Sequence, residues 1–156
     1  MNRTRTTALW LALGVAVLLT AGAGLAWGAP RDQWDYRHAS RTGLPAVTFT
    51  GDRGAPDTLE LYLRLYVGRL RDGDADRLSD LSWHRKWFAR DAEEAAARRA
   101  VATYGKGAAG PVAVELTPED PYDVRGGTIS FRATGQRQTF TVFRRNGLWL
   151  FVIGSD

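Results

Sequence analysis

The chain of 156 residues contains no cysteine and only two histidines, His38 and His84. The absence of cysteine excludes disulfide bonds, thiolate metal sites, a cysteine nucleophile and a lipid attached to an N-terminal cysteine. Two histidines that lie far apart in the sequence do not form a recognisable metal-ligand spacing. The sequence therefore predicts neither a metal site nor a bound cofactor.

Lysine is also scarce, because only Lys86 and Lys106 among the 21 basic residues are lysines. The formal net charge is +4, and without Arg3 and Arg5 the remaining chain has 19 basic against 17 acidic residues. Nucleic-acid-binding proteins gather basic residues on one face or in one run. Here the two signs are interspersed, so the basic pI does not predict a nucleic-acid partner.

The N-terminal region is uncharged over residues 6–30 and carries an apolar run of 21 residues at positions 8–28. A helix of that length spans roughly 30 Å, which is the thickness of a bilayer core. Trp10 and Trp27 lie near its two ends, where indole rings favour the membrane interface, and the two N-terminal arginines favour the cytoplasmic side. We therefore predict a single-pass anchor in the cell membrane, with a cytoplasmic N-terminus and an extracytoplasmic remainder.

A cleaved signal peptide is the alternative for the same region. Small residues at Ala21, Gly22 and Ala23 follow an apolar core, as at a cleavage site. The apolar run continues past Ala23 to Trp27, which favours the uncleaved anchor. Under either interpretation, residues 1–30 form a region separate from the extracytoplasmic domain.

Residues 31–56 have the composition of a linker, because they mix arginine, aspartate, glycine and proline with few apolar residues. Within this segment, residues 46–50 predict a short edge strand. Trp34 and Tyr36 either lie at the membrane surface or cap the domain. The folded domain is expected to comprise residues 57–156.

Three helices are predicted in the first half of this domain. The first begins at Asp57, three residues before a glutamate as in a capping box, and ends near Gly73. A second, short helix follows Asp74, and a third runs from Asp91 to Gly105. The apolar positions at helical spacing in the first helix are Leu59, Tyr62, Leu63, Tyr66, Val67 and Leu70.

The apolar pattern changes to a period of two after the third helix, which is typical of strands. It covers residues 112–116, 129–133 and 139–142. The Asn-Gly pair at 146–147 predicts a hairpin turn. The run 148–153 is apolar at every position, as expected for a strand covered on both faces. Helices followed by antiparallel strands indicate an α+β fold.

In this arrangement residues 57–154 resemble the nuclear transport factor 2-like superfamily, also called the SnoaL-like or cystatin-like α+β cone. The points of resemblance are the Asp-Gly-Asp turn at 72–74, the short helix with Leu78 and Leu81, and the ending in which an Asn-Gly turn leads into a strand with Trp149. The resemblance implies a curved sheet around the first helix. The expected fold is thus an N-terminal transmembrane helix, then three helices packed on a curved antiparallel sheet of about four strands.

The resemblance also implies a cone-shaped pocket that is open, filled or unused. Tyr62, Tyr66, Trp87 and Trp149 are the candidates to line it and to bind a ligand. The other interpretation of the two tyrosines is that they are core residues with satisfied hydroxyl groups. An open, polar cone would favour an enzyme, whereas a cone filled by Tyr62, Tyr66 and Trp149 would favour a scaffold.

Asp80 and His84 are the candidate catalytic residues. On a continuing helix they would meet as an acid–base dyad, which some SnoaL-like enzymes use. They also fit a solvated helix end, and no nucleophile or metal-ligand set accompanies them in the sequence. We therefore expect no catalytic residue.

The predicted function is a membrane-anchored extracytoplasmic interaction or ligand-binding domain without catalytic activity. Membrane-tethered relatives in the superfamily share this layout, including an assembly factor of type IV secretion, its Gram-positive conjugation relatives and proteins associated with Mce lipid import. The first alternative is therefore a subunit of an envelope secretion, conjugation or lipid-import machine, and the second is a SnoaL-like enzyme that uses Asp80 and His84. A homodimer through the sheet is also expected if Trp149, Phe151 and Ile153 form an exposed apolar row.

Overall fold

The computed structural model describes residues 35–51, 57–82, 90–118 and 122–151. The predicted anchor at residues 8–28 lies outside this part of the chain. No helix within the described ranges is both long and apolar enough to cross a membrane. The membrane segment therefore stays a prediction from the sequence.

The five strands form one mixed sheet in the order β1-β2-β3-β4-β5. They are β1 (Val47–Gly51), β2 (Val112–Leu116), β3 (Val124–Phe131), β4 (Gln136–Arg145) and β5 (Leu148–Phe151). β1 runs parallel to β2, and the other neighbours are antiparallel. The α+β class is confirmed, but the expected antiparallel sheet of about four strands was wrong. The edge strand predicted at 46–50 joins as a fifth strand, and it is parallel because the chain crosses over through the helices before β2 begins.

In the described part of the chain, three α-helices and one short 3-10 helix accompany the sheet. They are η1 (Tyr36–His38), α2 (Asp57–Asp72), α3 (Ala75–Ser79) and α4 (Arg90–Ala108). The three predicted helices are confirmed, although α4 continues beyond Gly105. A Cβ at Gly105 would lie 3.0 Å from the carbonyl oxygen of Leu70, so this glycine permits close approach between α4 and α2. Its small size therefore serves helix packing, and the helix ends three residues later.

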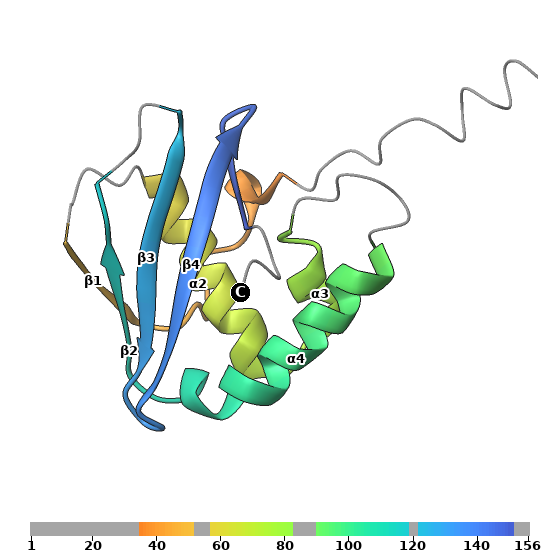
Figure 1. Ribbon diagram of the computed structural model, residues 1–156, viewed down its shortest axis with the longest axis vertical. Helices are drawn as coiled ribbons and strands as arrows, with labels where there is room; N and C mark the ends of the chain where they lie inside the picture. Colours follow the sequence, from red (N-terminus) through yellow and green to blue (C-terminus); the bar gives the residue numbers. More distant parts are fainter. Residues whose placement is uncertain (1–34, 52–56, 83–89, 119–121, 152–156) are drawn as a thin grey trace, which may run out of the picture. The chain divides into compact units, whose positions relative to one another are not determined.

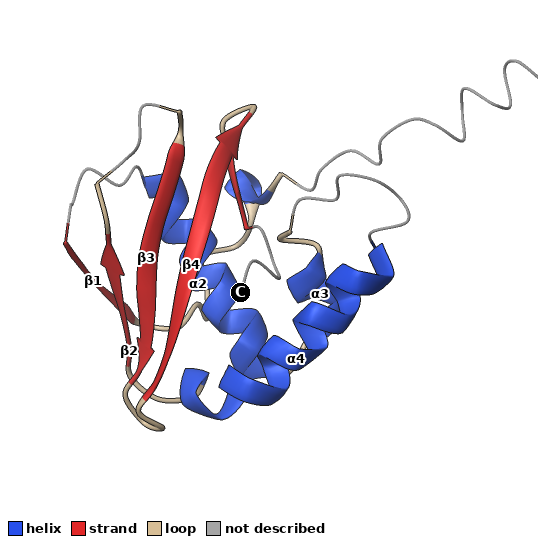
Figure 2. Ribbon diagram, in the orientation of Figure 1, coloured by secondary structure: helices blue, strands red, loops and turns tan. Residues whose placement is uncertain are grey.

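The helices cover one face of the sheet, as Figures 1 and 2 show. α2 lies between the sheet and the other helices, and it is buried on more than one side. Its buried residues are Leu59, Leu61, Tyr62, Leu63, Leu65, Tyr66, Val67, Gly68 and Leu70. On β3, every second residue faces this core, ending with the fully buried Ile129 and Phe131. The core therefore lies between α2 and the inner face of the sheet.

The last two strands form the hairpin that the Asn-Gly pair predicts. Arg145 pairs with Leu148, and the two turn residues have φ angles of 52° and 77°. Positive φ at both positions matches the twist of a two-residue hairpin. All four residues of β5 are buried, with exposed fractions of 6% or less. The prediction that both faces of the last strand are covered is confirmed for residues 148–151.

Burial of β5 also bears on the expected sheet-to-sheet dimer. Trp149 is 0% and Phe151 is 4% exposed within a single chain. The exposed apolar row that motivated the dimer is therefore absent at these two residues, while Ile153 lies outside the described ranges. A homodimer stays a prediction, but it needs a different surface.

The segment expected to be a linker contributes to the folded unit. Tyr36 is 1% and Val47 is 6% exposed, and both belong to the hydrophobic core. β1 lies within the same segment. The folded unit therefore begins before Asp57, and Tyr36 caps the domain, which was one of its two expected roles.

Gly127 provides a test of the packing between the sheet and its core. A Cβ at Gly127 would lie 2.5 Å from the carbonyl oxygen of Glu115 and 2.7 Å from the ring of Phe140. Gly127→Ala is expected to lower the free energy of unfolding by about 2–3 kcal/mol, because overpacking forces neighbours to shift. Thermal unfolding of the full chain in detergent, followed by circular dichroism, measures the change.

The matched control is Gly126→Ala on the same strand and the opposite face. Its Cβ would approach the Oγ1 of Thr117 at 3.3 Å, so a smaller loss is expected. Equal losses for the two variants would contradict the packing described for β3.

Candidate functional site

Three of the four side chains predicted to line a cone lie in the core. Tyr62, Tyr66 and Trp149 are 0%, 2% and 0% exposed, and Trp87 lies outside the described residues. The ring of Phe151 stacks on Tyr66 at a centroid distance of 4.4 Å and lies 5.3 Å from Tyr62. These aromatic side chains occupy the space between α2 and β5.

The hydroxyl group of Tyr62 connects α2, β5 and the residues after α3. It accepts a hydrogen bond of 2.7 Å from the backbone N–H of Phe151 and donates one of 2.5 Å to the carbonyl oxygen of Leu81. Ser82 forms an isolated parallel bridge with Phe151 next to this contact. Both hydrogen-bonding functions of the hydroxyl are therefore used within the fold.

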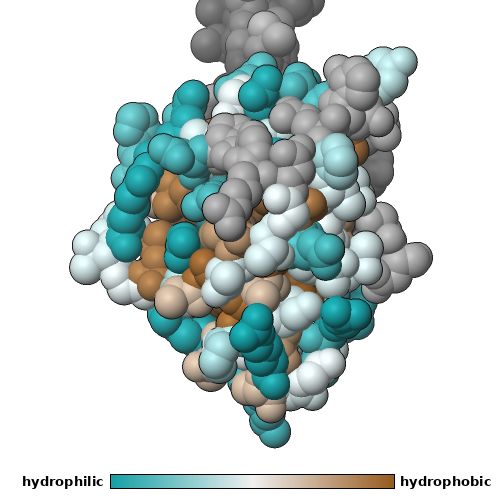
Figure 3. Space-filling view, turned by 90° about the vertical axis from the view of Figure 1, so that its left-hand side faces the viewer, coloured by the Kyte–Doolittle hydropathy of each residue, from teal (hydrophilic) through white to brown (hydrophobic). Residues whose placement is uncertain are grey.

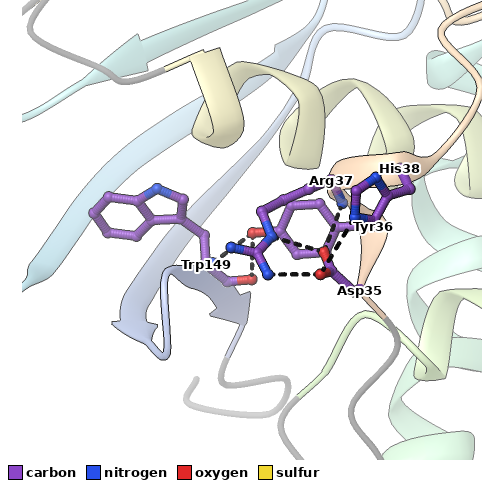
Figure 4. A network of polar contacts seen from close by, with 5 residues as sticks. All are labelled: Asp35, Tyr36, Arg37, His38 and Trp149. Atoms are coloured by element: carbon purple, nitrogen blue, oxygen red, sulfur yellow. Dashed lines mark hydrogen bonds and ion pairs between the residues drawn. The ribbon is translucent and has the colours of Figure 1, made fainter.

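Tyr36 makes an equivalent contact two residues earlier on β5 (Figure 4). Its hydroxyl donates to the carbonyl oxygen of Trp149 at 3.1 Å and accepts from the backbone N–H of the same residue. The rings of Tyr36 and Tyr62 lie 4.9 Å apart. Two tyrosine hydroxyls thus bind backbone groups of β5 along the edge that faces away from β4, where edge groups need partners other than the sheet.

The charges next to Tyr36 hold η1 in place. The side chain of Asp35 accepts a hydrogen bond from the backbone N–H of Arg37 and pairs with the Arg37 guanidinium at 2.6 Å. This hydrogen bond from the Arg37 side chain lowers the pKa of Asp35 to about 2. The Arg37 guanidinium also lies near the hairpin turn, 3.4 Å from where a Cβ of Gly147 would stand. The start of the described chain is thus held against the β4–β5 hairpin.

Trp149 has a different environment at its side chain and at its backbone. Figure 4 shows the indole ring pointing away from Tyr36, and the guanidinium of Arg144 lies 5.7 Å from the ring centroid. The indole N–H is buried and has no hydrogen-bond partner within the part of the chain that is described. The ring therefore serves packing and a cation–π contact.

The candidate dyad is only half described. Asp80 is exposed at the C-terminal end of α3, where its backbone N–H donates to the carbonyl oxygen of Asp76 at 3.3 Å. His84 lies outside the described residues, so the separation of the two side chains stays untested. Among the described residues, no group of three or more acidic, histidine or cysteine side chains is placed to hold a metal ion.

Arg125 is a buried residue that the sequence reasoning missed. It is 1% exposed on β3, and its Nε donates to the carbonyl oxygen of Thr117 at 3.0 Å. It lies on the same face of β3 as Ile129 and Phe131, because every second residue of this strand is buried. Extending the period-two pattern backwards from residue 129 would have placed this arginine on the core face.

A surface hollow of about 320 Å³ lies between α2 and the loop before β1. Its lining residues are Arg41, Leu44, Asp57, Glu60, Leu61 and Arg64. The Arg64 guanidinium donates to the carbonyl oxygen of Pro45 at 3.2 Å and lies 5.1 Å from the ring of Phe49. Arg64 is therefore occupied in holding the loop and β1 against α2. Of the predicted site residues that the structure describes, which are Tyr62, Tyr66, Asp80 and Trp149, none lines this hollow.

No protein-family model, curated protein or solved structure matches the chain. The resemblance to the nuclear transport factor 2-like superfamily therefore depends on the sequence features given above. The inferences about function depend on the geometry of this chain alone.

The two tyrosine contacts at β5 are testable by removing single oxygen atoms. Tyr36→Phe and Tyr62→Phe are each expected to lower the free energy of unfolding by about 1–3 kcal/mol, because each removes the hydroxyl partner of buried backbone groups, those of Trp149 or those of Phe151 and Leu81. Tyr104→Phe is the matched control, since that ring stacks on Phe131 at 5.1 Å and its hydroxyl forms no hydrogen bond to another described residue. It is expected to change stability by no more than about 0.5 kcal/mol. If all three variants melt alike in thermal unfolding, the role of the hydroxyls is wrong.

The same tyrosines predict a loss of stability at alkaline pH. Burial raises the pKa of Tyr36 and of Tyr62 above the ordinary value, and backbone hydrogen bonds oppose part of the shift. Below a pH of about 10 the tyrosine hydroxyls are protonated in both the folded and the unfolded chain. Above it, the unfolded chain loses protons that the folded chain keeps. Stability therefore falls as pH rises from about 10 towards the folded-state pKa, by up to about 1.4 kcal/mol per pH unit for the fully buried Tyr62. Melting temperatures across this range should decline less steeply in Tyr62→Phe than in the unaltered chain.

Proposed function

We propose that the chain is a single-pass, membrane-anchored interaction domain that acts outside the cytoplasm and has no catalytic activity. The anchor is the uncharged apolar segment at residues 8–28. The domain that follows presents its surface to partners instead of enclosing a reaction site. In an envelope secretion, conjugation or lipid-import machine, such a domain would act as a tethered subunit.

The non-enzymatic part of this proposal is supported by one observation: the described residues that were predicted to line a cone are buried in the core. Tyr62 and Tyr66 are buried against Phe151, and the Tyr62 hydroxyl makes two hydrogen bonds to the backbone. The Tyr66 hydroxyl accepts a hydrogen bond of 2.7 Å from the side-chain amide of Gln138. Hydroxyl groups engaged in this way hold the fold together and are not presented to a ligand. This is the filled arrangement that favours a scaffold over a SnoaL-like enzyme.

The enzyme remains the second candidate, and it depends on Asp80 and His84. Asp80 is exposed at a helix end, and its backbone serves to terminate α3. His84, the other member of the dyad, lies outside the described residues. The geometry of the described residues therefore offers less support to the enzyme than to the interaction domain.

Cell fractionation tests the anchor on which the proposal depends. A C-terminally tagged full chain is expected in the membrane fraction, resistant to alkaline extraction, with the mass of the intact sequence. Protease added to spheroplasts should remove the tag, because the domain lies outside the cytoplasm. The reason is that a 21-residue apolar helix spans the bilayer core while the N-terminal arginines stay inside.

The matched variant for this experiment is Ala23→Leu, which places a bulky residue at the candidate cleavage site. An anchor is expected to give the same mass and location with or without this change. A soluble product trimmed after Ala23, which becomes membrane-bound only in the variant, would identify a signal peptide and contradict the anchor.

A further inference from the structure

The two edges of the sheet differ in whether their backbone groups are bound by other parts of the domain. At β5, the backbone groups of Trp149 bind the Tyr36 hydroxyl, and the N–H of Phe151 binds the Tyr62 hydroxyl. Ser82 adds a bridge at the same edge. This edge is closed to a further strand by side chains of its own domain.

β1 forms the opposite edge, and among the described strands it pairs with β2 alone. A side-chain hydrogen bond from β1, which Thr50 Oγ1 donates to the carbonyl oxygen of Val114, points towards β2. Within the described ranges, no side chain or loop forms a hydrogen bond with the outer edge of this strand. Unpaired N–H and C=O groups along an edge are a template for another strand.

The sequence of β1 lacks the devices by which proteins protect an exposed edge. The strand reads Val-Thr-Phe-Thr-Gly, with no charged residue, no proline and two exposed threonines, Thr48 and Thr50. Phe49 lies on the inner face, where Arg64 covers its ring at 5.1 Å, so the edge itself is not blocked by this contact. Lysine, proline and bulges are the usual means of preventing edge pairing.

We propose that β1 pairs with β1 of a second copy of the chain, antiparallel and about a two-fold axis at Phe49. The two five-stranded sheets would then continue into one another. This deepens the function proposed above by naming a second copy as the partner, and it rests on that proposal because the anchor supplies the local concentration.

A second copy fits this edge for three reasons. A two-fold axis places β1 of one copy opposite β1 of the other, and because the strand carries no charge the two copies do not repel one another. The axis at Phe49 is the position that overlaps all five residues of both strands, which gives the most backbone hydrogen bonds. It sets Thr48 of one copy opposite Thr50 of the other, and threonine pairs are favourable across strands.

The size of the contact explains why the anchor matters. Pairing two five-residue strands buries less surface than the roughly 1,200 Å² typical of stable complexes between soluble proteins. Confining both copies to one membrane raises their effective concentration, which permits a contact too small to persist in dilute solution.

Figure 3 views the side of the domain on which β1 lies in Figure 1, and apolar side chains there reach the surface between hydrophilic ones.

Cysteine cross-linking tests the pairing and its register together, because the chain has no cysteine of its own. Full-length Thr48→Cys and Thr50→Cys chains with different tags are co-expressed and oxidised in isolated membranes. The mixed disulfide is expected at about tenfold the yield of either homotypic product, because residues 48 and 50 are directly opposite whereas identical residues are diagonal, beyond disulfide reach.

The control pair is Thr139→Cys with Thr141→Cys on β4, because both residues are exposed on the same outer face of the sheet but not at an edge. Equal cross-linking of the β1 and β4 pairs, or no mixed product from β1, would overturn the proposal. Strong homotypic products without the mixed one would overturn it as well.

A second arm removes the contact without altering the core. Adding Thr48→Lys or Thr50→Lys to the partner position of each cysteine chain sets like charges opposite one another and is expected to lower the mixed product about tenfold. Lysines at Thr139 and Thr141 serve as the charge control and should leave it unchanged. The cross-link is scored in whichever fraction holds the chain, so a failed anchor and a failed β1 pairing give separate results.

Discussion

The fold depends on two tyrosine hydroxyls that satisfy the backbone of the last strand. Tyr36 binds both backbone groups of Trp149, and Tyr62 joins Phe151 to Leu81. Without these contacts, the outer edge of β5 would present buried donors and acceptors without partners, which costs more than an ordinary hydrogen bond contributes. The position of η1, the course of the chain after α3 and the closure of one sheet edge all follow from them.

Local sequence patterns were sufficient for most elements of the domain. The helical spacing from Leu59 to Leu70 and the period-two runs are local, and the Asn-Gly turn has its own backbone requirement, met by two positive φ angles. Gly105 was misleading, because a glycine that ends one helix serves in another as a point of close packing. The parallel pairing of β1 could not be derived from five residues, since it is set by the crossover through three helices.

The candidate site was harder to predict for the same reason. Tyr62 and Tyr66 could be assigned to one helix face, but whether that face lined a pocket or filled a core depended on how Phe151 packs against it. Tyr36 stood in a polar segment with no periodic pattern, and its partner lies 113 residues away. Arg125 was within reach of the alternation along β3, but an arginine is rarely expected on the core face. Contacts between distant segments decided each of these positions.

The separation of 113 residues between Tyr36 and Trp149 also constrains how the domain folds. Contacts between the two ends of a chain carry the largest loop-closure cost and form late. Synthesis proceeds from the N-terminus, so Tyr36 is made long before β5. The hydroxyl of Tyr36 forms its two hydrogen bonds to Trp149 only once the final strand is in place. The domain can therefore complete its fold only after β5 has been made, which makes these hydrogen bonds a check that the last strand is present.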